Sequence, residues 1–272
     1  MPKPQFTREA DMLAPIANQA TQLMPGTSET LYEVQTTAGI PDIVFIDFDT
    51  VALEHRQGIS KSFIVDFSDM CVLQALDEFD AEVISAAELA ARLPLSAKYI
   101  SSTVLPRLAE YGYVCKQSRG KWLSVSKFKS LAKRICTVEV KIRDWRGGYS
   151  QTLRHRASTD AAWLVLDSTY STPATAHKEW FKRAGIGLAT VDMEQGVKRV
   201  VAPKPKRGGS KRSAYRELLA ERAAHLYVTG QTSGSVGLVF GVDLTTTTGP
   251  DPRRPSVGEP HSFPEVAHST TS

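Results

Sequence analysis

Apolar residues follow a helical period near the N-terminus and a strand period after it. Over residues 7–23 they recur every three to four positions, which predicts a helix that Thr7 caps. Residues 31–49 carry two runs of β-branched and aromatic side chains separated at Thr36–Gly39, which predicts two strands. A further short strand is expected over 62–67. The first quarter of the chain is therefore expected to open an α/β fold.

From residue 69 the pattern becomes helical and then ends in a hairpin. Helices are expected over 70–79, after a capping box at Ser85, and from Ser96 onward. Two short strands with a turn at 118–120 follow. This order of helices and hairpin is typical of a winged helix-turn-helix, which we expect over 69–126.

The second half of the chain alternates helices with strands and ends in a tail. Helices are expected over 127–134, 149–157, 174–184 and 213–227, and strands over 135–142, 161–167, 187–192 and 197–202. Residues 203–212 form a basic linker. Beyond 229, the high content of Gly, Ser, Thr and Pro predicts a disordered C-terminal tail.

Composition places the chain among ordinary globular proteins. A length of 272 residues fits one large domain or two small ones, and 42% of the residues are hydrophobic. No apolar run approaches the roughly 18–20 residues of a membrane span, and the N-terminus lacks the apolar core of a signal peptide. We therefore expect a cytoplasmic protein without a membrane partner. The three cysteines form no C-x-x-C pair and are interpreted as reduced packing residues.

Charge is distributed unevenly along the chain. Residues 127–156 hold nine basic and two acidic side chains, and residues 198–222 hold the same numbers. Residues 1–69 are acidic, with ten acidic and four basic side chains. Clustered Lys and Arg favour a polyanion partner, because they replace condensed counterions on phosphates. The alternative is a solvated charged surface without a partner.

Three residues are candidates for a hydrolytic centre. Asp42 opens the second predicted strand, while Glu139 and Lys141 lie two positions apart on another strand, with Val140 pointing into the core. If these strands are neighbours, Asp42 and Glu139 share a hard cation through carboxylate oxygens. Lys141 then holds the attacking water or neutralises charge on a phosphate. The set predicts hydrolysis of phosphodiester bonds.

This spacing of motifs resembles a known family. Pro41-Asp42 followed by Glu139-Val140-Lys141 resembles the PD-(D/E)XK nuclease superfamily, which includes restriction endonucleases, resolvases and repair nucleases. The resemblance implies a restriction-endonuclease-like mixed sheet flanked by helices. It also implies that Asp42 and Glu139 bind Mg²⁺, with Mn²⁺ as the expected substitute, and that Lys141 assists the attacking water.

The resemblance extends to side chains on two helices. An acidic residue on the helix before the motif often adds a metal contact in the family; Glu9 is the best match and Glu33 is a weaker one. A Gln on the helix after the E-x-K strand often assists catalysis, which matches Gln151. The neighbouring Arg154 and Arg156 are expected to face phosphates.

One departure from the family is the long separation of the two motifs. Asp42 and Glu139 lie 97 positions apart, which an inserted winged helix explains, although Asp47 and Asp49 stay open as alternatives to Asp42. The expected organisation is a nuclease core in two segments, an insertion, a basic linker with a helix, and the tail: residues 1–68 and 127–202, 69–126, 203–228, and 229–272.

The predicted insertion offers side chains to DNA. Its recognition helix spans 96–111. The helix and the wing present the following groups to bases and phosphates: Lys98, Tyr99, Ser102, Arg107, Lys116, Arg119 and Lys121. Arg143 and Arg146, on either side of Trp145, add cations in the loop after Lys141. The alternative is that the winged helix binds a protein or forms a dimer.

The remaining motifs favour no other chemistry. The histidines lack metal-ligand spacing and are interpreted as surface or packing residues: His55, His155, His177, His225, His261 and His268. There is no P-loop, no G-x-S-x-G and no dinucleotide-binding fingerprint in the sequence.

The leading hypothesis is a Mg²⁺-dependent DNA endonuclease, in the setting of restriction, phage defence or a mobile element. One rival is a non-enzymatic winged-helix DNA-binding regulator on an inactive nuclease scaffold. Another is a nuclease that acts on branched or single-stranded DNA, or on RNA. A homodimer and a protein partner in a multi-component system are further open possibilities.

Overall fold

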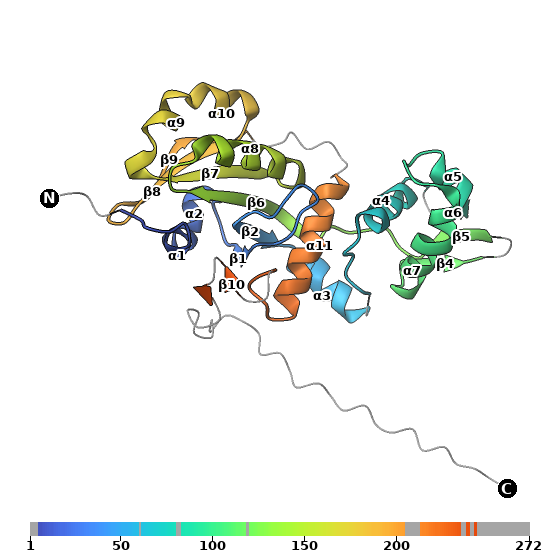
Figure 1. Ribbon diagram of the computed structural model, residues 1–272. Coiled ribbons are helices and arrows are strands. Elements are labelled where there is room, and N and C mark those ends of the chain that lie inside the picture. Colours follow the sequence, from blue (N-terminus) through green and yellow to red (C-terminus); the bar gives the residue numbers. More distant parts are fainter. Residues whose placement is uncertain are drawn as a thin grey trace, which may run out of the picture.

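The chain folds into a sheet with helices on both faces and a smaller helical unit beside it. The structure, a computed structural model, describes residues 5–59, 61–79, 83–117, 120–204, 213–234, 238–239 and 242–243. In Figure 1 the sheet lies on the left, the smaller unit lies on the right, and helix α11 runs between them. We call residues 69–126 the insert.

Six strands form one mixed sheet in the order β1-β2-β6-β7-β8-β9. Their bounds are β1 (Glu29–Tyr32), β2 (Ile43–Phe48), β6 (Ala132–Lys141), β7 (Ala161–Asp167), β8 (Gly187–Asp192) and β9 (Gly196–Val201). Neighbours are parallel at β6/β7 and β7/β8 and antiparallel elsewhere. The expected α/β class with a mixed sheet flanked by helices is confirmed.

Side chains alternate between the two faces of the sheet, as period two requires. Phe45, Val138 and Val165 pack with the first helices, α1 (Ala10–Asn18) and α2 (Ala20–Leu23). The opposite face is covered by five further helices: α3 (Thr50–Gly58), α8 (Trp145–His155), α9 (Thr172–Ala176), α10 (Lys178–Ala184) and α11 (Ala214–Val228). These layers bury both faces of the central strands.

The insert has a core of its own and the order of elements expected from the sequence. It comprises all but the first two residues of α4 (Phe67–Leu76), and then β3 (Ile84–Ser85), α5 (Ala86–Ala90), α6 (Ala97–Tyr99), a π-helical turn (Ile100–Val104), α7 (Leu105–Glu110), β4 (Val114–Lys116) and β5 (Lys121–Ser124). The strands form a small sheet in the order β3-β5-β4. The capping box at Ser85 is confirmed, because Ser85 and Glu88 bind each other's backbone N–H groups.

Helix α11 joins the insert to the sheet. Leu218 belongs to the apolar core of the insert, whereas Leu219 and Ala223 pack on the sheet. Between them, the buried Glu221 accepts hydrogen bonds from Arg56 of α3 at 2.9 and 3.0 Å and from the Ile64 N–H at 3.0 Å. The helix expected over 213–227 therefore forms, but it is buried on most sides instead of being amphipathic.

Two sequence predictions of secondary structure are wrong. Residues 62–67 form no strand, because Glu221 binds the Ile64 N–H, Arg222 binds the Val65 carbonyl and α4 begins at Phe67. Residues 127–134 form no helix, since the Phe128 N–H binds the Asp77 carboxylate and β6 already begins at Ala132. In both segments, side chains distant in sequence form hydrogen bonds with backbone groups that a regular helix or strand would use.

The first helix also starts later than its sequence predicted. α1 begins at Ala10, its N-cap is Glu9, and the Glu9 side chain makes no capping hydrogen bond. Thr7 instead donates its hydroxyl to Asp11 at 3.1 Å. Because Glu9 is not used in capping, its carboxylate is available to reach toward the end of β6.

Parts of the predicted linker, wing and tail lie outside the described residues. These parts are 205–212, the turn residues 118–119 and most of 235–272. Two short strands, β10 (Leu238–Val239) and β11 (Val242–Asp243), pair with each other, and Ser233 forms a bridge to Tyr32. Among the described residues, no helix has the length and apolarity needed to cross a membrane.

Candidate active site

Asp42, Glu139 and Lys141 meet at one end of the sheet. Ile43 pairs with Val138 in the antiparallel register of β2 and β6, so Asp42 and Glu139 take the next opposed positions. Val140 is buried against α1, as predicted, which turns Glu139 and Lys141 toward the opposite face, where α8 packs. The fold thus brings the two separated motifs side by side.

Four side chains and the backbone hold this end of the sheet together. The Asp42 carboxylate accepts a hydrogen bond from the Val140 N–H at 2.6 Å. The Lys141 ammonium lies 2.9 Å from Glu139 Oε1 and 3.5 Å from Glu9 Oε2. Glu9 Oε1 also accepts from the Ile142 N–H at 3.4 Å. Two carboxylates therefore contact one ammonium group, and the charge of Asp42 also acts on it.

Burial makes this cluster electrostatically unusual. Asp42 is 7% exposed and Glu139 is 2% exposed. Burial, followed by the charge of Glu139, raises the pKa of Asp42 to about 7. The hydrogen bond from the Val140 N–H and the charge of Lys141 act in the opposite direction and lower this pKa. Burial acts to lower the pKa of Lys141, but Glu139, Asp42 and Glu9 outweigh it and raise the pKa. Lys141 is thus a protonated donor and not a base.

Helix α8 approaches the site closely. Asp144 caps it by accepting from the Gly147 N–H at 2.9 Å. A Cβ at Gly148 would lie 2.9 Å from Lys141 Cγ and 2.6 Å from Leu164, so only glycine fits there without a shift. Gln151 is half-buried and follows the buried Gly148 by three residues, which puts both on one side of the helix. The structure thus places Gln151 on the face of α8 that packs over Lys141.

The cluster has the chemistry of a divalent-cation site. Within the described chain, Glu139 Oε2 is buried without a hydrogen-bond partner, and Asp42 offers a second carboxylate beside it. Hard cations take such oxygen ligands, with waters completing the shell. Among the described residues, no group of three or more His, Cys, Asp and Glu is arranged to hold a metal ion. In the part of the chain that the structure describes, Asp42 and Glu139 thus offer carboxylate oxygens, the ligand type of a hard cation, as two residues and not as a group of three.

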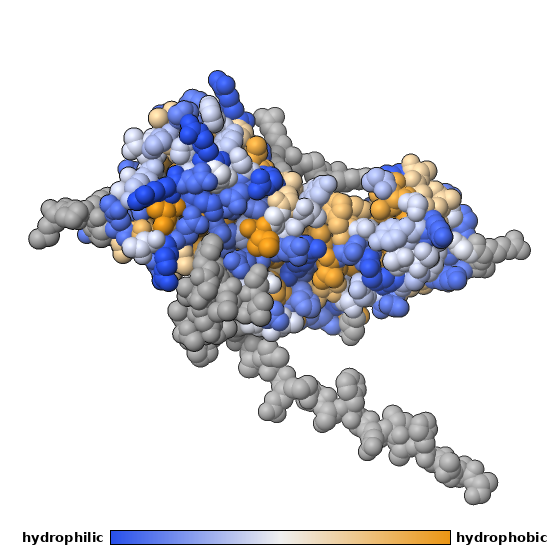
Figure 2. Space-filling view, in the orientation of Figure 1, coloured by the Kyte–Doolittle hydropathy of each residue, from blue (hydrophilic) through white to orange (hydrophobic). Residues whose placement is uncertain are grey.

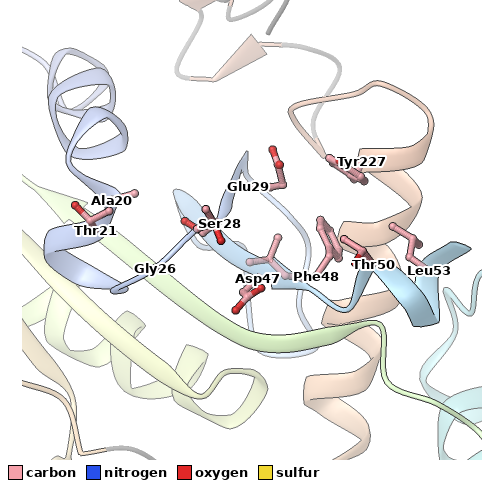
Figure 3. A pocket seen from close by; sticks show the side chains of 12 residues that line it. Ala20, Thr21, Gly26, Ser28, Glu29, Asp47, Phe48, Thr50, Leu53 and Tyr227 are labelled. Atoms are coloured by element: carbon pink, nitrogen blue, oxygen red, sulfur yellow. The ribbon is translucent and has the colours of Figure 1, made fainter. Parts of the chain in front are cut away.

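The alternatives to Asp42 lie at the far end of β2. Asp47 pairs with Arg134 at 3.2 Å, and Asp49 caps α3 by accepting from the Ala52 N–H. Asp47 lines a separate pocket of about 440 Å³ together with Phe48 and Tyr227. Figure 3 shows this pocket beside the end of β2 and α11. Asp42 is therefore the acidic residue of this strand that faces Glu139.

The cations predicted around the site have different surroundings. Arg143 is exposed, donates to the Tyr170 hydroxyl at 2.7 Å and stacks over its ring. Arg146 is exposed and lies 4.9 Å from the ring centre of Trp145, and Arg154 is exposed on α8. Arg156 instead donates to the backbone carbonyls of Gly185 and Lys204.

The predicted DNA contacts of the insert fall into two groups. Lys98, Ser102 and Lys116 are exposed, and Tyr99 is half-buried. Arg107 forms a two-point ion pair with Asp69 at 2.6 Å, and Lys121 lies 3.0 Å from Glu88. Arg119 lies outside the described residues.

One residue beside the site was interpreted from sequence as a packing histidine. His155 lies near the end of α8, and its Nε2 is 3.3 Å from Glu139 Oε2. Its spacing of four from Gln151 puts both on one side of the helix, which is the signal that the sequence offered.

Searches for known relatives add nothing to this geometry. No family model, no curated protein and no solved structure matches this chain.

Proposed function

We propose that this chain is a Mg²⁺-dependent DNA endonuclease with a PD-(D/E)XK core into which a winged-helix module is inserted. The observation that carries the proposal is the juxtaposition of Asp42 and Glu139, both buried, with Lys141 at 2.9 Å from Glu139. Burying two carboxylates side by side costs free energy. Such a cost is typical of functional sites.

The strand order supports the same proposal. β1, β2 and β6 form an antiparallel meander, and α8 then crosses to the parallel strand β7. A restriction-endonuclease-like core, as the sequence resemblance implies it, is a mixed sheet flanked by helices. The insert enters between β2 and β6, which accounts for the long separation of the two motifs.

Each residue has a defined task in the proposed reaction. Asp42 and Glu139 would hold Mg²⁺, which supplies Lewis-acid polarisation of the scissile phosphate and a lower pKa for bound water. Lys141, protonated and held between Glu139 and Glu9, donates hydrogen bonds to the attacking water and balances charge on the phosphate. Gln151 orients the same water from α8.

The exposed cations would bind the DNA backbone. Arg143, Arg146 and Arg154 are exposed close to the site, and Lys98 and Lys116 are exposed on the insert. Figure 2 shows a largely hydrophilic surface over the sheet and more apolar residues over the insert and its junction. Phosphate contacts of this kind position the duplex without reading its sequence.

Cleavage assays test the proposal. Purified protein is incubated with supercoiled plasmid, linear duplex, single-stranded DNA and RNA in Mg²⁺, Mn²⁺ or EDTA. We expect metal-dependent cleavage of DNA, and a loss of at least about 100-fold in Asp42→Ala and Lys141→Ala. Asp47→Ala is the matched control, because Asp47 lies on the same strand but at its other end.

The two rival functions give different results in the same assay. DNA binding that is unchanged in EDTA and unaccompanied by cleavage would identify a regulator on an inactive scaffold. Cleavage of RNA or of single strands alone would keep the active site and change its substrate. Equal cleavage by wild type and both variants would refute the catalytic assignment.

A further inference from the structure

His155 packs against the back of the candidate active site. The residue is 2% exposed, and its Nε2 lies 3.3 Å from Glu139 Oε2. The two atoms are close but are not aligned as a hydrogen bond. Within the described part of the chain, Glu139 Oε2 and both ring nitrogens of His155 are buried without a hydrogen-bond partner. Buried polar atoms are rarely left in this condition, so the pair calls for a functional explanation.

The surroundings hold the histidine ring in place. Gly39 has a φ of +130°, and a Cβ at this position would lie 3.0 Å from His155 Cε1. The turn that contains Gly39 is fixed by Thr36, whose hydroxyl donates to the Gly39 carbonyl at 2.7 Å. The ring thus packs against this turn on one side, and its Nε2 lies 3.3 Å from Glu139 Oε2.

The two oxygens of Glu139 have different neighbours. Oε1 faces Lys141 at 2.9 Å, whereas Oε2 faces His155. A donor on one lone pair of Oε2 fixes the rotation of the carboxylate and keeps Oε1 directed toward Lys141. The second lone pair of Oε2 stays free for the cation. Side chains that orient a metal-binding carboxylate in this way contribute to metal affinity without touching the metal.

We propose that His155 is a positioning residue that donates its Nε2–H to Glu139 Oε2 and holds this carboxylate ready for the divalent cation. The inference rests on the proposed function, since it concerns the same site. A small rotation of the ring or of the carboxylate brings the atoms into hydrogen-bond geometry. His155 contacts neither the cation nor the substrate.

Direct Mn²⁺ binding, followed by electron paramagnetic resonance without any DNA, tests the inference. We expect His155→Phe, which preserves the ring volume but not the donor, to weaken Mn²⁺ binding about 10- to 100-fold. His155→Asn, whose amide is too short to reach Oε2, should weaken it similarly. His155→Gln, whose amide nitrogen occupies the place of Nε2, should restore most of the affinity.

Kinetics and two controls complete the experiment. At subsaturating Mn²⁺, His155→Phe should keep the KM for DNA, because the DNA contacts are unchanged, and should lose kcat, because fewer sites hold the cation. Saturating Mn²⁺ should restore most of kcat. His225→Phe is the matched control, since His225 is exposed on α11 and contacts the Phe63 ring instead of the site. Thermal unfolding of each variant separates loss of the donor from loss of the fold.

The outcomes separate this inference from the proposed function. Wild-type Mn²⁺ affinity in both His155→Phe and His155→Asn, with a loss in Glu139→Ala, would overturn the role of His155 alone. Wild-type affinity in Glu139→Ala would overturn the metal site and the inference with it. Equal weakening in His155→Phe and His155→Gln would show that packing, not the donor, matters.

Discussion

Two clusters of buried charge in this molecule are built in opposite ways. At the junction of α3 and α11, both oxygens of Glu221 accept hydrogen bonds, and Arg56 is 2.9 Å away. At the end of β2 and β6, Asp42 lies beside Glu139, and within the described chain Glu139 Oε2 has no hydrogen-bond partner. Lys141 balances only part of the negative charge there.

The difference indicates which cluster stabilises the fold and which one serves function. A matched buried pair fixes the relative position of two elements and is strongly disrupted when one partner is removed. An excess of carboxylates opposes folding and is retained where a cation or a reacting group compensates it. The Arg56–Glu221 pair thus belongs to the architecture, and under the proposed function the Asp42–Glu139 pair belongs to the active site.

Breaking the matched pair should give the largest change in stability. Arg56→Met leaves Glu221 buried without its counter-charge, so we expect the free energy of unfolding to fall by about 3–5 kcal/mol. Urea unfolding measures this change. The double variant Arg56→Met/Glu221→Leu should recover most of the loss, because both charges are then absent. A loss below about 1 kcal/mol in the single variant would contradict the structural role.

Removing the charge of Asp42 should raise the free energy of unfolding, whereas breaking the Arg56–Glu221 pair lowers it. The pKa of Asp42 is raised from 3.8 to about 7, so the folded state binds its proton more tightly than the unfolded state. Its contribution to stability is complete below about pH 4 and is lost as the pH rises through 7. Asp42→Asn cannot ionise, so at pH 8 in EDTA it should be more stable than wild type by about 2–4 kcal/mol.

The pH profile of unfolding provides the control for Asp42. At about pH 3, below both pKa values, the variant and wild type should differ least in free energy of unfolding, since Asp42 is then protonated in the folded and in the unfolded protein. Equal slopes of stability against pH in the two proteins would show that Asp42 titrates normally and would contradict this prediction.

The surface of the insert also carries both exposed lysines and a lysine that is paired with a carboxylate. Lys98 and Lys116 are exposed, whereas Lys121 lies 3.0 Å from Glu88. If the insert binds duplex DNA, Lys98→Ala/Lys116→Ala should lower the slope of log affinity against log salt by about 2. Lys121→Ala should lower it by less, because Glu88 already neutralises this ammonium. Fluorescence anisotropy at several salt concentrations measures both slopes, and equal effects would contradict the distinction.

Local patterns predicted the elements whose partners are nearby in sequence. The apolar runs of β7 and β8 gave the correct strands, and period two placed Glu139 and Lys141 on one face. The juxtaposition of Asp42 and Glu139, 97 positions apart, was predicted only on the condition that their strands are neighbours, and the register of β2 and β6 makes them so. These features depend on backbone geometry and burial, which the sequence carries directly.

The failures depend on partners that are distant in sequence. The backbone of 62–67 is bound by Glu221 and Arg222, which lie more than 150 positions away, so no local pattern reveals its irregular path. Arg156 has cationic chemistry suited to phosphate but is bound to the Gly185 carbonyl. The proximity of His155 to Glu139 was not predicted, because the packing of α8, and not a motif, brings the two residues together.

The places where the chain leaves and re-enters the sheet determine how far the insert is attached from the candidate active site. The chain leaves the sheet after Phe48 and returns at Ala132, whereas Asp42 and Glu139 lie at the other ends of the same two strands. Six residues of β2 span about 20 Å, which equals the rise of about six base pairs of duplex DNA. An enzyme built in this way would touch DNA with its insert at one place and cut it at least half a helical turn away.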